Sequence, residues 1–371
     1  MTELPPTKTG VRRWRFVVSQ GSPPNRVRHT RVHQGQNVRA AQAALRQFVA
    51  DLEQRAPTSS SAPTLGELLE RWRAHCVTIG RAATTMESVR LVTNLRLAPI
   101  AHWRIDQITP ADLDRLYHAI LAEGRAPATV RQVHAIIRRS LRQAVLWGLI
   151  DNNPAERVQP PSLGQHEIVP PSTADVRRLL EVADRTDPLI GLYLRLAATT
   201  GARRAELCGL KWSDLDGATV TVRRTVSAIR GIHAEAPTKT RSVRQIVLPP
   251  DMVAGLERRR RFVRAQCMQV RTAIDDGWWV FPLGEPWAVR PWPPDGASAR
   301  FARVRTAAGV TMRLHDLRHW SATTLLDAGV SLVSVAARLG HADGTTTMKV
   351  YGHRTQRADE ESAEIMAKML G

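Results

Sequence analysis

The sequence has 371 residues, with 53 Lys and Arg against 34 Asp and Glu, which gives a formal net charge of +19. This length allows two or three domains, while the lack of any apolar run of ~18 residues and of an apolar signal core predicts a cytoplasmic protein. The cysteines Cys76, Cys208 and Cys267 form no CxxC pair, which argues against a disulfide scaffold or a cysteine zinc site. The excess of arginine favours a polyanionic partner such as nucleic acid, because the planar guanidinium suits phosphate oxygens. The alternative is an arginine-rich solvated surface.

Residues 1–55 are basic and contain two stretches with period-2 alternation. RRWRFVVSQG and NRVRHTRVHQG alternate basic with apolar or aromatic residues, which predicts two strands joined by the turn GSPPN. NVRAAQAALRQFVADLEQR has apolar residues at helical spacing. We therefore expect a two- or three-stranded sheet with one helix. Its basic face either contacts DNA through Arg12, Arg13 and Arg15 or is only solvated.

Residues 64–152 are helical in pattern and follow the linker-like stretch APTSSSAPT. Thr64 begins the first helix with the spacing of a capping box, and Pro110 lies in the first turn of another. APATVRQVHAIIRRSLRQAVLWGLI predicts one long helix whose basic residues lie mainly off the apolar stripe. We expect a bundle of four or five helices with a basic DNA-binding face, on which the long helix contributes Arg131, Arg138, Arg139 and Arg142.

A Pro-rich second linker, residues 151–172, precedes a mixed pattern of helices and strands. Helices are predicted over 173–185 and 189–201, strands over 218–229 and 244–249, and helices again beyond 249. The predicted fold is multidomain and mainly α with small β-sheets. It consists of a basic N-terminal sheet with a helix, a helical bundle, a mixed α/β domain and a tail, with boundaries at 1–55, 64–152, 170–355 and 356–371.

Four polar islands interrupt the helices of the last domain. TTGARRAELCGL places Arg203 three residues before Glu206, on one helical face, at a helix start suited to a phosphate. RLHDLRHWSATTLLDAG places His315 and Arg318 on one face in the same way. His315 and His319 also have the spacing of a zinc pair, but the HExxH glutamate and a clear third ligand are missing.

The other two islands are a predicted turn and a polar stretch late in the chain, whose tyrosine we expect on a polar helix. TKTRS predicts the tight turn of a hairpin, from which Lys239 reaches outward. LGHADGTTTMKVYGH contains His341 and one of only three tyrosines in the chain, Tyr351. We interpret Tyr117 and Tyr193 as core residues because they lie in apolar helical runs, whereas the neighbours of Tyr351 are polar.

Together the islands resemble the tyrosine recombinase family of phage-type integrases. That family has an Arg in a TGxRxxE box, a Lys on a β-hairpin, an HxxR box, a Gly-His pair and a Tyr about ten residues later. The same order occurs here in TGARRAE at 200–206, Lys239, His315–Arg318, Gly340–His341 and Tyr351. The resemblance covers residues 64–355, and residues 1–55 resemble the arm-binding domain of many phage integrases. Arg204 stands where many members have an apolar residue.

The resemblance implies a recombinase that cleaves and rejoins DNA through a covalent 3′-phosphotyrosine, in the service of a phage or mobile element. In that chemistry Tyr351 is the nucleophile, because a phenol of pKa ~10 can attack phosphorus as it loses its proton. The reaction also requires neutralisation of the negative charge on the nonbridging oxygens and a proton for the leaving oxygen. The roles implied are clamping of nonbridging oxygens by Arg203 and Arg318, proton transfer by His315, donation to the departing 5′-oxygen by Lys239, a hydrogen bond to a nonbridging oxygen from His341, and orientation of Arg203 by Glu206.

The resemblance also implies partners and cofactors. The partners are double-stranded DNA attachment sites, further copies of the chain in a homotetramer on paired sites, and an accessory directionality factor. Neither ATP nor a metal cofactor is implied, because the phosphotyrosine retains the bond energy. The acidic and then amphipathic tail packs either on its own chain or on a neighbouring protomer, through Ile365, Met366, Met369 and Leu370.

Two alternatives use the same residues or the same fold. A type IB topoisomerase relaxes DNA through the same phosphotyrosine but acts alone and with little sequence demand. A noncatalytic DNA-binding regulator would retain the fold, but simple binding does not require Arg203, Lys239, Arg318 and Tyr351 together.

Overall fold

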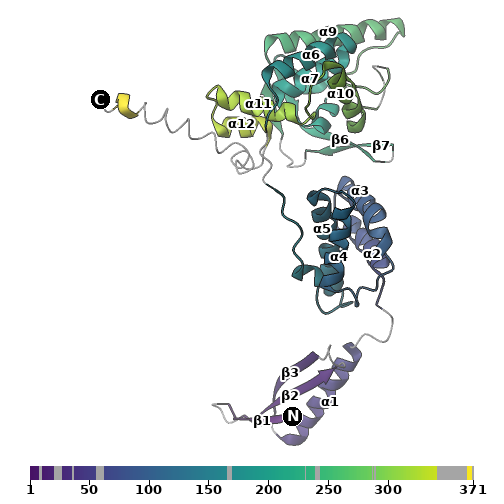
Figure 1. The fold of residues 1–371 in the computed structure, drawn as a ribbon, viewed down its shortest axis with the longest axis vertical. Coiled ribbons are helices and arrows are strands. Elements are labelled where there is room, and N and C mark those ends of the chain that lie inside the picture. Colours follow the sequence, from purple (N-terminus) through teal and green to yellow (C-terminus); the bar gives the residue numbers. More distant parts are fainter. Residues whose placement is uncertain are drawn as a thin grey trace. The chain divides into compact units, whose positions relative to one another are not determined.

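Figure 1 shows the fold of the chain in a computed structural model. The chain divides into two compact units, residues 1–163 and 164–371, and each is described by itself. The finer division of the first unit at residues 56–63 stays a prediction. The structure describes residues 1–7, 11–20, 27–35, 37–55, 62–164, 169–229, 231–238, 243–285, 287, 290–340 and 366–369.

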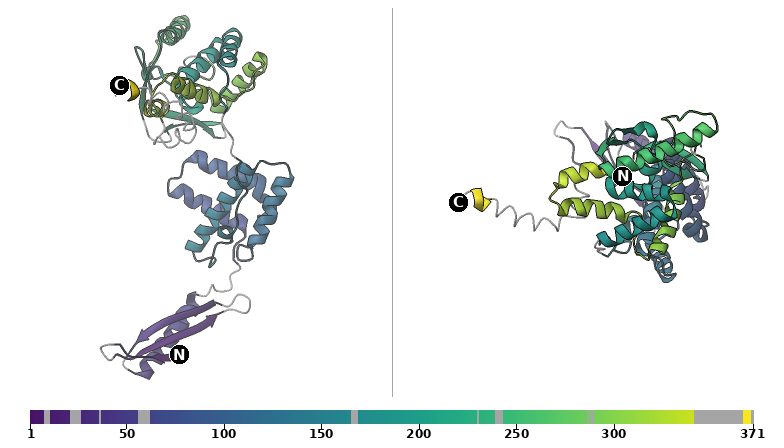
Figure 2. Two further views of the ribbon diagram at one scale, coloured as in Figure 1. Left: turned by 60° about the vertical axis from the view of Figure 1, so that its left-hand side comes forward. Right: turned by 90° about the horizontal axis from the view of Figure 1, so that it is seen from above.

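The N-terminal part is a sheet with one helix, and the predicted strands and helix are present. Strands β1 (Thr2–Leu4), β2 (Arg13–Gln20) and β3 (Val27–Gln34) form an antiparallel sheet in the order β1-β2-β3. Helix α1 (Val38–Arg55) crosses one face of it (Figure 2). On that face Trp14 and Phe16, each 1% exposed, pack with Ala41 of α1.

The opposite face of this sheet carries basic side chains. Strand β2 places Arg13 and Arg15 on the face away from α1, because alternate residues of a strand point to opposite sides. Arg28 pairs with Ser19 in the ladder and joins them on that face. Arg12, which precedes the strand, is engaged locally, with its Nη2 2.8 Å from Glu3 Oε1. The predicted turn GSPPN lies outside the described residues.

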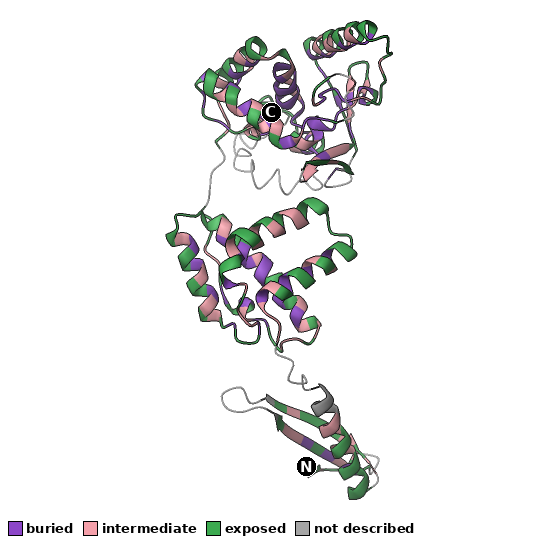
Figure 3. Ribbon diagram, turned by 90° about the vertical axis from the view of Figure 1, so that its right-hand side faces the viewer, coloured by how far each residue is buried: buried purple, intermediate pink, exposed green. Residues whose placement is uncertain are grey.

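The second part of unit 1 is a bundle of four α-helices with a core of its own. Both predicted helix starts are confirmed, since Thr64 and Thr109 each form a capping box, with Glu67 and Asp112. The buried residues, coloured purple in Figure 3, lie mainly on the sides of the helices that face one another. The helices are α2 (Leu65–Thr78), α3 (Ala83–Val92), α4 (Pro110–Ala122) and α5 (Pro127–Leu146), with a π-turn at Thr93–Leu97 and 3-10 turns at Ala98–Ile100 and Pro154–Arg157.

Helix α5 has the basic surface that the sequence predicts. Arg131, Arg138 and Arg142 follow one another at i, i+7 and i+11, a spacing that keeps them on one helical face, and Arg139 lies beside them. All four are exposed. Two already have partners in the free protein: Arg138 lies 3.9 Å from Glu156, and Arg131 donates to the carbonyl of Pro161 at 3.2 Å.

Unit 2 is mainly helical, with small sheets. Its core gathers side chains from helices and strands, among them Tyr193, Trp212 and Phe281. The helices are α6 (Thr173–Thr186), α7 (Pro188–Thr200), α8 (Arg204–Cys208), α9 (Pro250–Gln269), α10 (Pro294–Ala308), α11 (Asp316–Asp327) and α12 (Leu332–Leu339), with a 3-10 turn at Trp212–Asp214. One sheet has the order β4-β5-β8, from Leu215–Asp216, Thr219–Val222 and Arg244–Val247, and β6 (Arg224–Ile229) and β7 (Ile232–Pro237) form a hairpin.

The strands around Lys239 differ from the sequence prediction. We expected a hairpin closed by TKTRS, but the flanking strands β7 and β8 belong to different sheets. Strand β7 pairs instead with β6, from Arg224 opposite Pro237 to Ile229 opposite Ile232. The turn between those two strands includes Gly231 with φ 80°, a conformation that favours glycine. The segment 239–242 therefore connects two sheets, and Lys239 itself lies outside the described residues.

The structure describes only part of the predicted apolar face of the tail. Met366 and Met369 are exposed in a short helical turn, while Ile365 and Leu370 lie outside the described residues. None of the described helices combines the length and the apolar character needed to cross a membrane.

Candidate active site

The site is built around the turn between α7 and α8. Gly201 ends α7 with φ 62°, and a Cβ atom at this position would lie 2.4 Å from Cδ2 of Leu339. Glycine therefore satisfies both the left-handed backbone and the close packing of α12. The turn brings Arg203 to the N-terminus of α8, as its capping residue.

Arg203 and Glu206 form the ion pair that their spacing suggests. The Arg203 backbone N–H donates to Glu206 Oε2 at 2.8 Å, and Arg203 Nη1 donates to Oε1 at 3.0 Å. The Glu206 side chain is 0% exposed, whereas that of Arg203 is 29% exposed. Burial alone would raise the pKa of the Glu206 carboxyl, but the arginine partners outweigh it and hold the pKa below its ordinary value. Glu206 is therefore a buried carboxylate that supports a partly exposed guanidinium.

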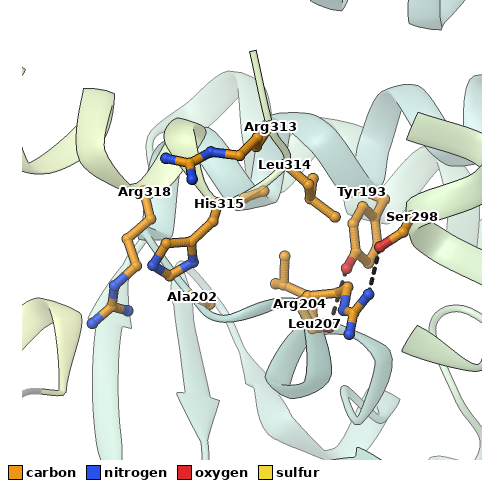
Figure 4. A pocket seen from close by; sticks show the side chains of 10 residues that line it. Tyr193, Ala202, Arg204, Leu207, Ser298, Arg313, Leu314, His315 and Arg318 are labelled. Atoms are coloured by element: carbon orange, nitrogen blue, oxygen red, sulfur yellow. Dashed lines mark hydrogen bonds between the residues drawn. The ribbon is translucent and has the colours of Figure 1, made fainter. Parts of the chain in front are cut away.

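Helix α11 brings Arg318 to the same turn. Arg318 is 5% exposed, and its Nη1 donates to the carbonyl of Gly201 at 2.6 Å. His315 directly precedes α11, so His315 and Arg318 lie together beside the pocket in Figure 4. The ring of His315 lies 5.0 Å from that of His319 in an edge-on arrangement. Residues 203, 315 and 318 thus converge from segments more than a hundred positions apart.

A cavity of about 360 Å³ opens beside His315 and Arg318. Figure 4 shows His315 and Arg318 on one side of it and Arg204 and Ser298 on the other. Arg204 Nη1 donates to Ser298 Oγ at 2.6 Å and lies 3.2 Å from Asp295 Oδ1. The pocket therefore has cationic groups on both sides.

Both tyrosines predicted to be core residues are buried. Tyr193, at the edge of this pocket, donates its hydroxyl to the carbonyl of Arg204 at 3.1 Å. Tyr117 packs inside the bundle with its hydroxyl 3.0 Å from His134 Nδ1. Neither phenol is placed to attack a substrate.

The surroundings of His315 lower the pKa of its imidazole. Desolvation by the surrounding protein, together with the nearby His319 and Arg318, lowers the pKa of His315 to about 4. An imidazole with a lowered pKa stays neutral at the pH of the cell and is ready to accept a proton.

We expect an NMR titration of the free protein to show His315 still neutral at pH 6, where an ordinary histidine of pKa ~6.5 is mostly protonated. The variant His319→Gln removes the repulsion between protonated His319 and His315, so the pKa of His315 should move upward in it. A titration midpoint at 6.5 or above in the unmodified protein would contradict this account.

The predicted site residues divide into two groups. Arg203, Glu206, His315 and Arg318 are brought together around Gly201. Lys239, His341 and Tyr351 lie outside the described residues. Gly340, directly before His341, ends α12 with φ 71°, and its carbonyl oxygen lies 3.5 Å from Arg203 Nη2.

The sequence reasoning missed Arg244, which is the second cation on Glu206. Its Nη2 donates to Glu206 Oε2 at 2.7 Å from the start of β8. A signal was present: Arg244 is in phase with Ile246 and Leu248 in a period-2 strand whose alternate residues are buried. A charged residue at a core-facing position predicts a buried ion pair.

The sequence of this chain matches the phage integrase family over residues 172–357, half of its length. It is 28% identical over 287 residues to a prophage phiRv2 integrase of Mycobacterium tuberculosis, covering 76% of this chain and 72% of that protein. It is 22% identical over 385 residues to a XerC-like tyrosine recombinase of Caldanaerobacter subterraneus, covering 97% of both chains.

Solved structures share the fold. The Tn1549 transposon integrase in complex with a circular intermediate DNA has a TM-score of 0.67 and 19% identity, covering 81% of this chain and 99% of that one. A lambda integrase tetramer bound to a Holliday junction has a TM-score of 0.60 and 18% identity, covering 92% of this chain and 95% of that one. The chain belongs to the phage integrase family. Its activity is that of a tyrosine-type site-specific DNA recombinase.

Proposed function

We propose that this protein recombines DNA at specific sites with Tyr351 as its nucleophile. The observation that carries the proposal is the convergence of Arg203, His315 and Arg318 around the turn at Gly201, with the buried Glu206 behind Arg203. Two guanidinium groups and a neutral imidazole at one place suit a phosphodiester, which needs charge neutralisation and proton transfer as it reacts.

The reaction forms one bond and breaks another at the same phosphorus. The phenol oxygen of Tyr351 attacks and passes its proton to His315, and the bond from phosphorus to the 5′-oxygen breaks. Lys239 donates a proton to the departing oxygen, which leaves as a free 5′-hydroxyl. Arg203, Arg318 and His341 hold the nonbridging oxygens. Rejoining is the reverse attack by a 5′-hydroxyl on the 3′-phosphotyrosine, so the balance needs no outside energy source.

The rest of the chain holds the DNA. We assign residues 1–55 as an arm-type DNA-binding domain, 64–152 as a core-binding domain, 170–355 as the catalytic domain and 356–371 as the tail. The exposed arginines of α5 and the open face of the N-terminal sheet support the first two assignments, because arginine is a frequent phosphate ligand. The described relatives bind DNA, and one is a tetramer on a Holliday junction, which supports a homotetramer on paired attachment sites here. An accessory directionality factor completes the proposed partners.

A trapping assay tests the function. The protein is incubated with nicked core-site DNA in EDTA, and the products are separated on a denaturing gel. A covalent protein–DNA adduct is expected, because the phosphotyrosine forms without a metal. No adduct, or an adduct that needs Mg²⁺, would overturn the proposed mechanism. A topoisomerase would show the adduct on unrelated DNA without pairing two sites, and a noncatalytic regulator would bind without any adduct.

Deleting residues 1–55 should separate two kinds of DNA binding. The truncated protein is expected to lose binding to accessory arm sites and to keep measurable cleavage of a core site. A double substitution tests the open face of the sheet alone. Arg13→Ala with Arg15→Ala should make the plot of log affinity for arm DNA against log salt concentration shallower, by roughly 0.9 per lost phosphate contact.

Arg46→Ala is the matched control for this prediction, because Arg46 is exposed on α1, away from the open face. Its salt slope should equal that of the unmodified protein. A folded truncated protein that cannot cleave a core site would show that residues 1–55 are not a separate arm-binding domain.

A further inference from the structure

Arg244 occupies a core-facing position of strand β8, where an apolar residue is usual. It is 8% exposed at the start of β8 and points to the same side as the buried Ile246. Its guanidinium has three anchors: Nη2 to Glu206 Oε2 at 2.7 Å, Nη1 to Glu206 Oε1 at 3.3 Å, and Nε to the carbonyl of Arg338 at 2.9 Å. A single side chain thus ties β8 to both α8 and the end of α12.

Gly340 shows how closely this guanidinium packs. A Cβ atom on Gly340 would lie 2.8 Å from Arg244 Nη1 and 3.1 Å from its Cζ. Those distances are below a van der Waals contact, so the guanidinium occupies the space that any other residue at 340 would need. The carbonyl of Gly340 in turn lies 3.5 Å from Arg203 Nη2. Arg244, Glu206, Arg203 and Gly340 therefore close a ring of contacts just before His341.

The charges in this ring explain why two arginines share one carboxylate. Glu206 is fully buried and would be strongly destabilising without a cation, because an unpaired buried charge is poorly solvated. With Arg244 as its buried partner, Glu206 is already compensated. The group of Arg244, Glu206 and Arg203 then has a net positive charge, which the partly exposed Arg203 can present to an incoming phosphate. Without Arg244, Glu206 would attract the Arg203 guanidinium alone.

We propose that Arg244 is a positioning residue for strand cleavage. It acts through Glu206 on Arg203, and through the end of α12 on the segment that begins with His341. This inference rests on the proposed function, since it assigns Arg203 to the scissile phosphate. Its role is alignment in the reacting complex and not affinity for DNA, because Arg244 is buried and exposes almost no surface to a ligand.

The test is single-turnover adduct formation by Arg244→Lys at saturating nicked core-site DNA. Lysine keeps the charge but has one compact ammonium group, which cannot bridge Glu206 and the Arg338 carbonyl as the guanidinium does. We expect the rate to fall roughly 10- to 100-fold, as for a small misplacement of a catalytic group. The Kd for the core site should change less than twofold.

Arg224→Lys is the matched control. Arg224 is also an arginine on a buried carboxylate, Asp214, in the same unit but in a different ion-pair network. Both variants should lose similar thermal stability, and only Arg244→Lys should lose cleavage rate. If Arg244→Lys does not fold, the double variant Arg244→Met with Glu206→Gln is compared with Glu206→Gln alone. The double variant should cleave more slowly, because it also loses the contact of Arg244 with the Arg338 carbonyl, and equal rates would overturn the proposal.

A double-mutant cycle separates the possible results. If Arg244 acts through Arg203, adding Arg244→Lys to Arg203→Ala should slow cleavage less than it slows the unmodified protein. Independent, multiplicative losses would overturn the proposal, and so would an Arg244→Lys rate within twofold of the unmodified protein. Absence of any adduct from the unmodified protein would instead overturn the proposed function itself.

Discussion

Tyr351→Phe is expected to abolish covalent adduct formation while leaving folding and DNA binding intact. The substitution removes one oxygen and keeps the ring, so a structural tyrosine would lose only ~1 kcal/mol and most of its activity would remain. A nucleophile has no substitute for that oxygen. The measurement is adduct yield on nicked core-site DNA in EDTA, with DNA affinity determined in parallel.

Tyr193→Phe is the matched control for this prediction. Tyr193 is a buried phenol at the edge of the pocket beside His315 and Arg318, and its hydroxyl donates to a backbone carbonyl. Its loss should lower stability modestly and leave the adduct. An adduct from Tyr351→Phe, or loss of the adduct from Tyr193→Phe in a folded protein, would contradict the assignment of the nucleophile.

Removing either arginine of the site should give the second-largest effect. Arg203→Ala and Arg318→Ala each remove a donor whose hydrogen bonds are strongest in the transition state, where charge on the phosphate is greatest. We expect the single-turnover cleavage rate to fall by at least ~10²–10³, the loss seen for one oxyanion donor. Affinity for DNA should fall far less, because many other arginines share the binding. The measurement is the cleavage rate at saturating DNA together with the Kd.

The control for the arginines is Arg195→Ala. Arg195 lies on α7, the helix that leads into the site. It forms an ion pair with Asp184 of α6 and not with a residue of the site. Because Arg318 is buried, its variant also needs a thermal unfolding measurement, so that lost activity is counted per folded molecule. Equal losses of binding and cleavage would show that the two arginines are ordinary phosphate anchors.

Much of the site could be predicted because its signals are local in the sequence. Arg203 and Glu206 sit three residues apart on the first turn of a helix, and His315 and Arg318 have the same spacing at the start of α11. Helix starts, caps and glycine stops depend on neighbouring residues, so Thr64, Thr109 and Gly201 could be identified from the sequence. The side to which such residues point follows from helical geometry.

The parts that could not be predicted depend on long-range pairing. IHAEAP contains few strong strand formers, and β7 forms because β6 offers it a ladder of partners across a glycine turn. The period-2 phase of Arg244 indicates burial, but its partners, Glu206 and the carbonyl of Arg338, are defined only once α8 and α12 are folded against β8. A pattern read along the chain does not contain these contacts.

Identifying the residue that carries the DNA tests the central claim most directly. The adduct formed in EDTA is digested with a protease, and the peptide attached to the oligonucleotide is sequenced by mass spectrometry. We expect a single phosphotyrosine at Tyr351, linked to the 3′ end of the cleaved strand, with a free 5′-hydroxyl on the other fragment. Attachment at any other residue, or linkage to the 5′ end, would contradict the account.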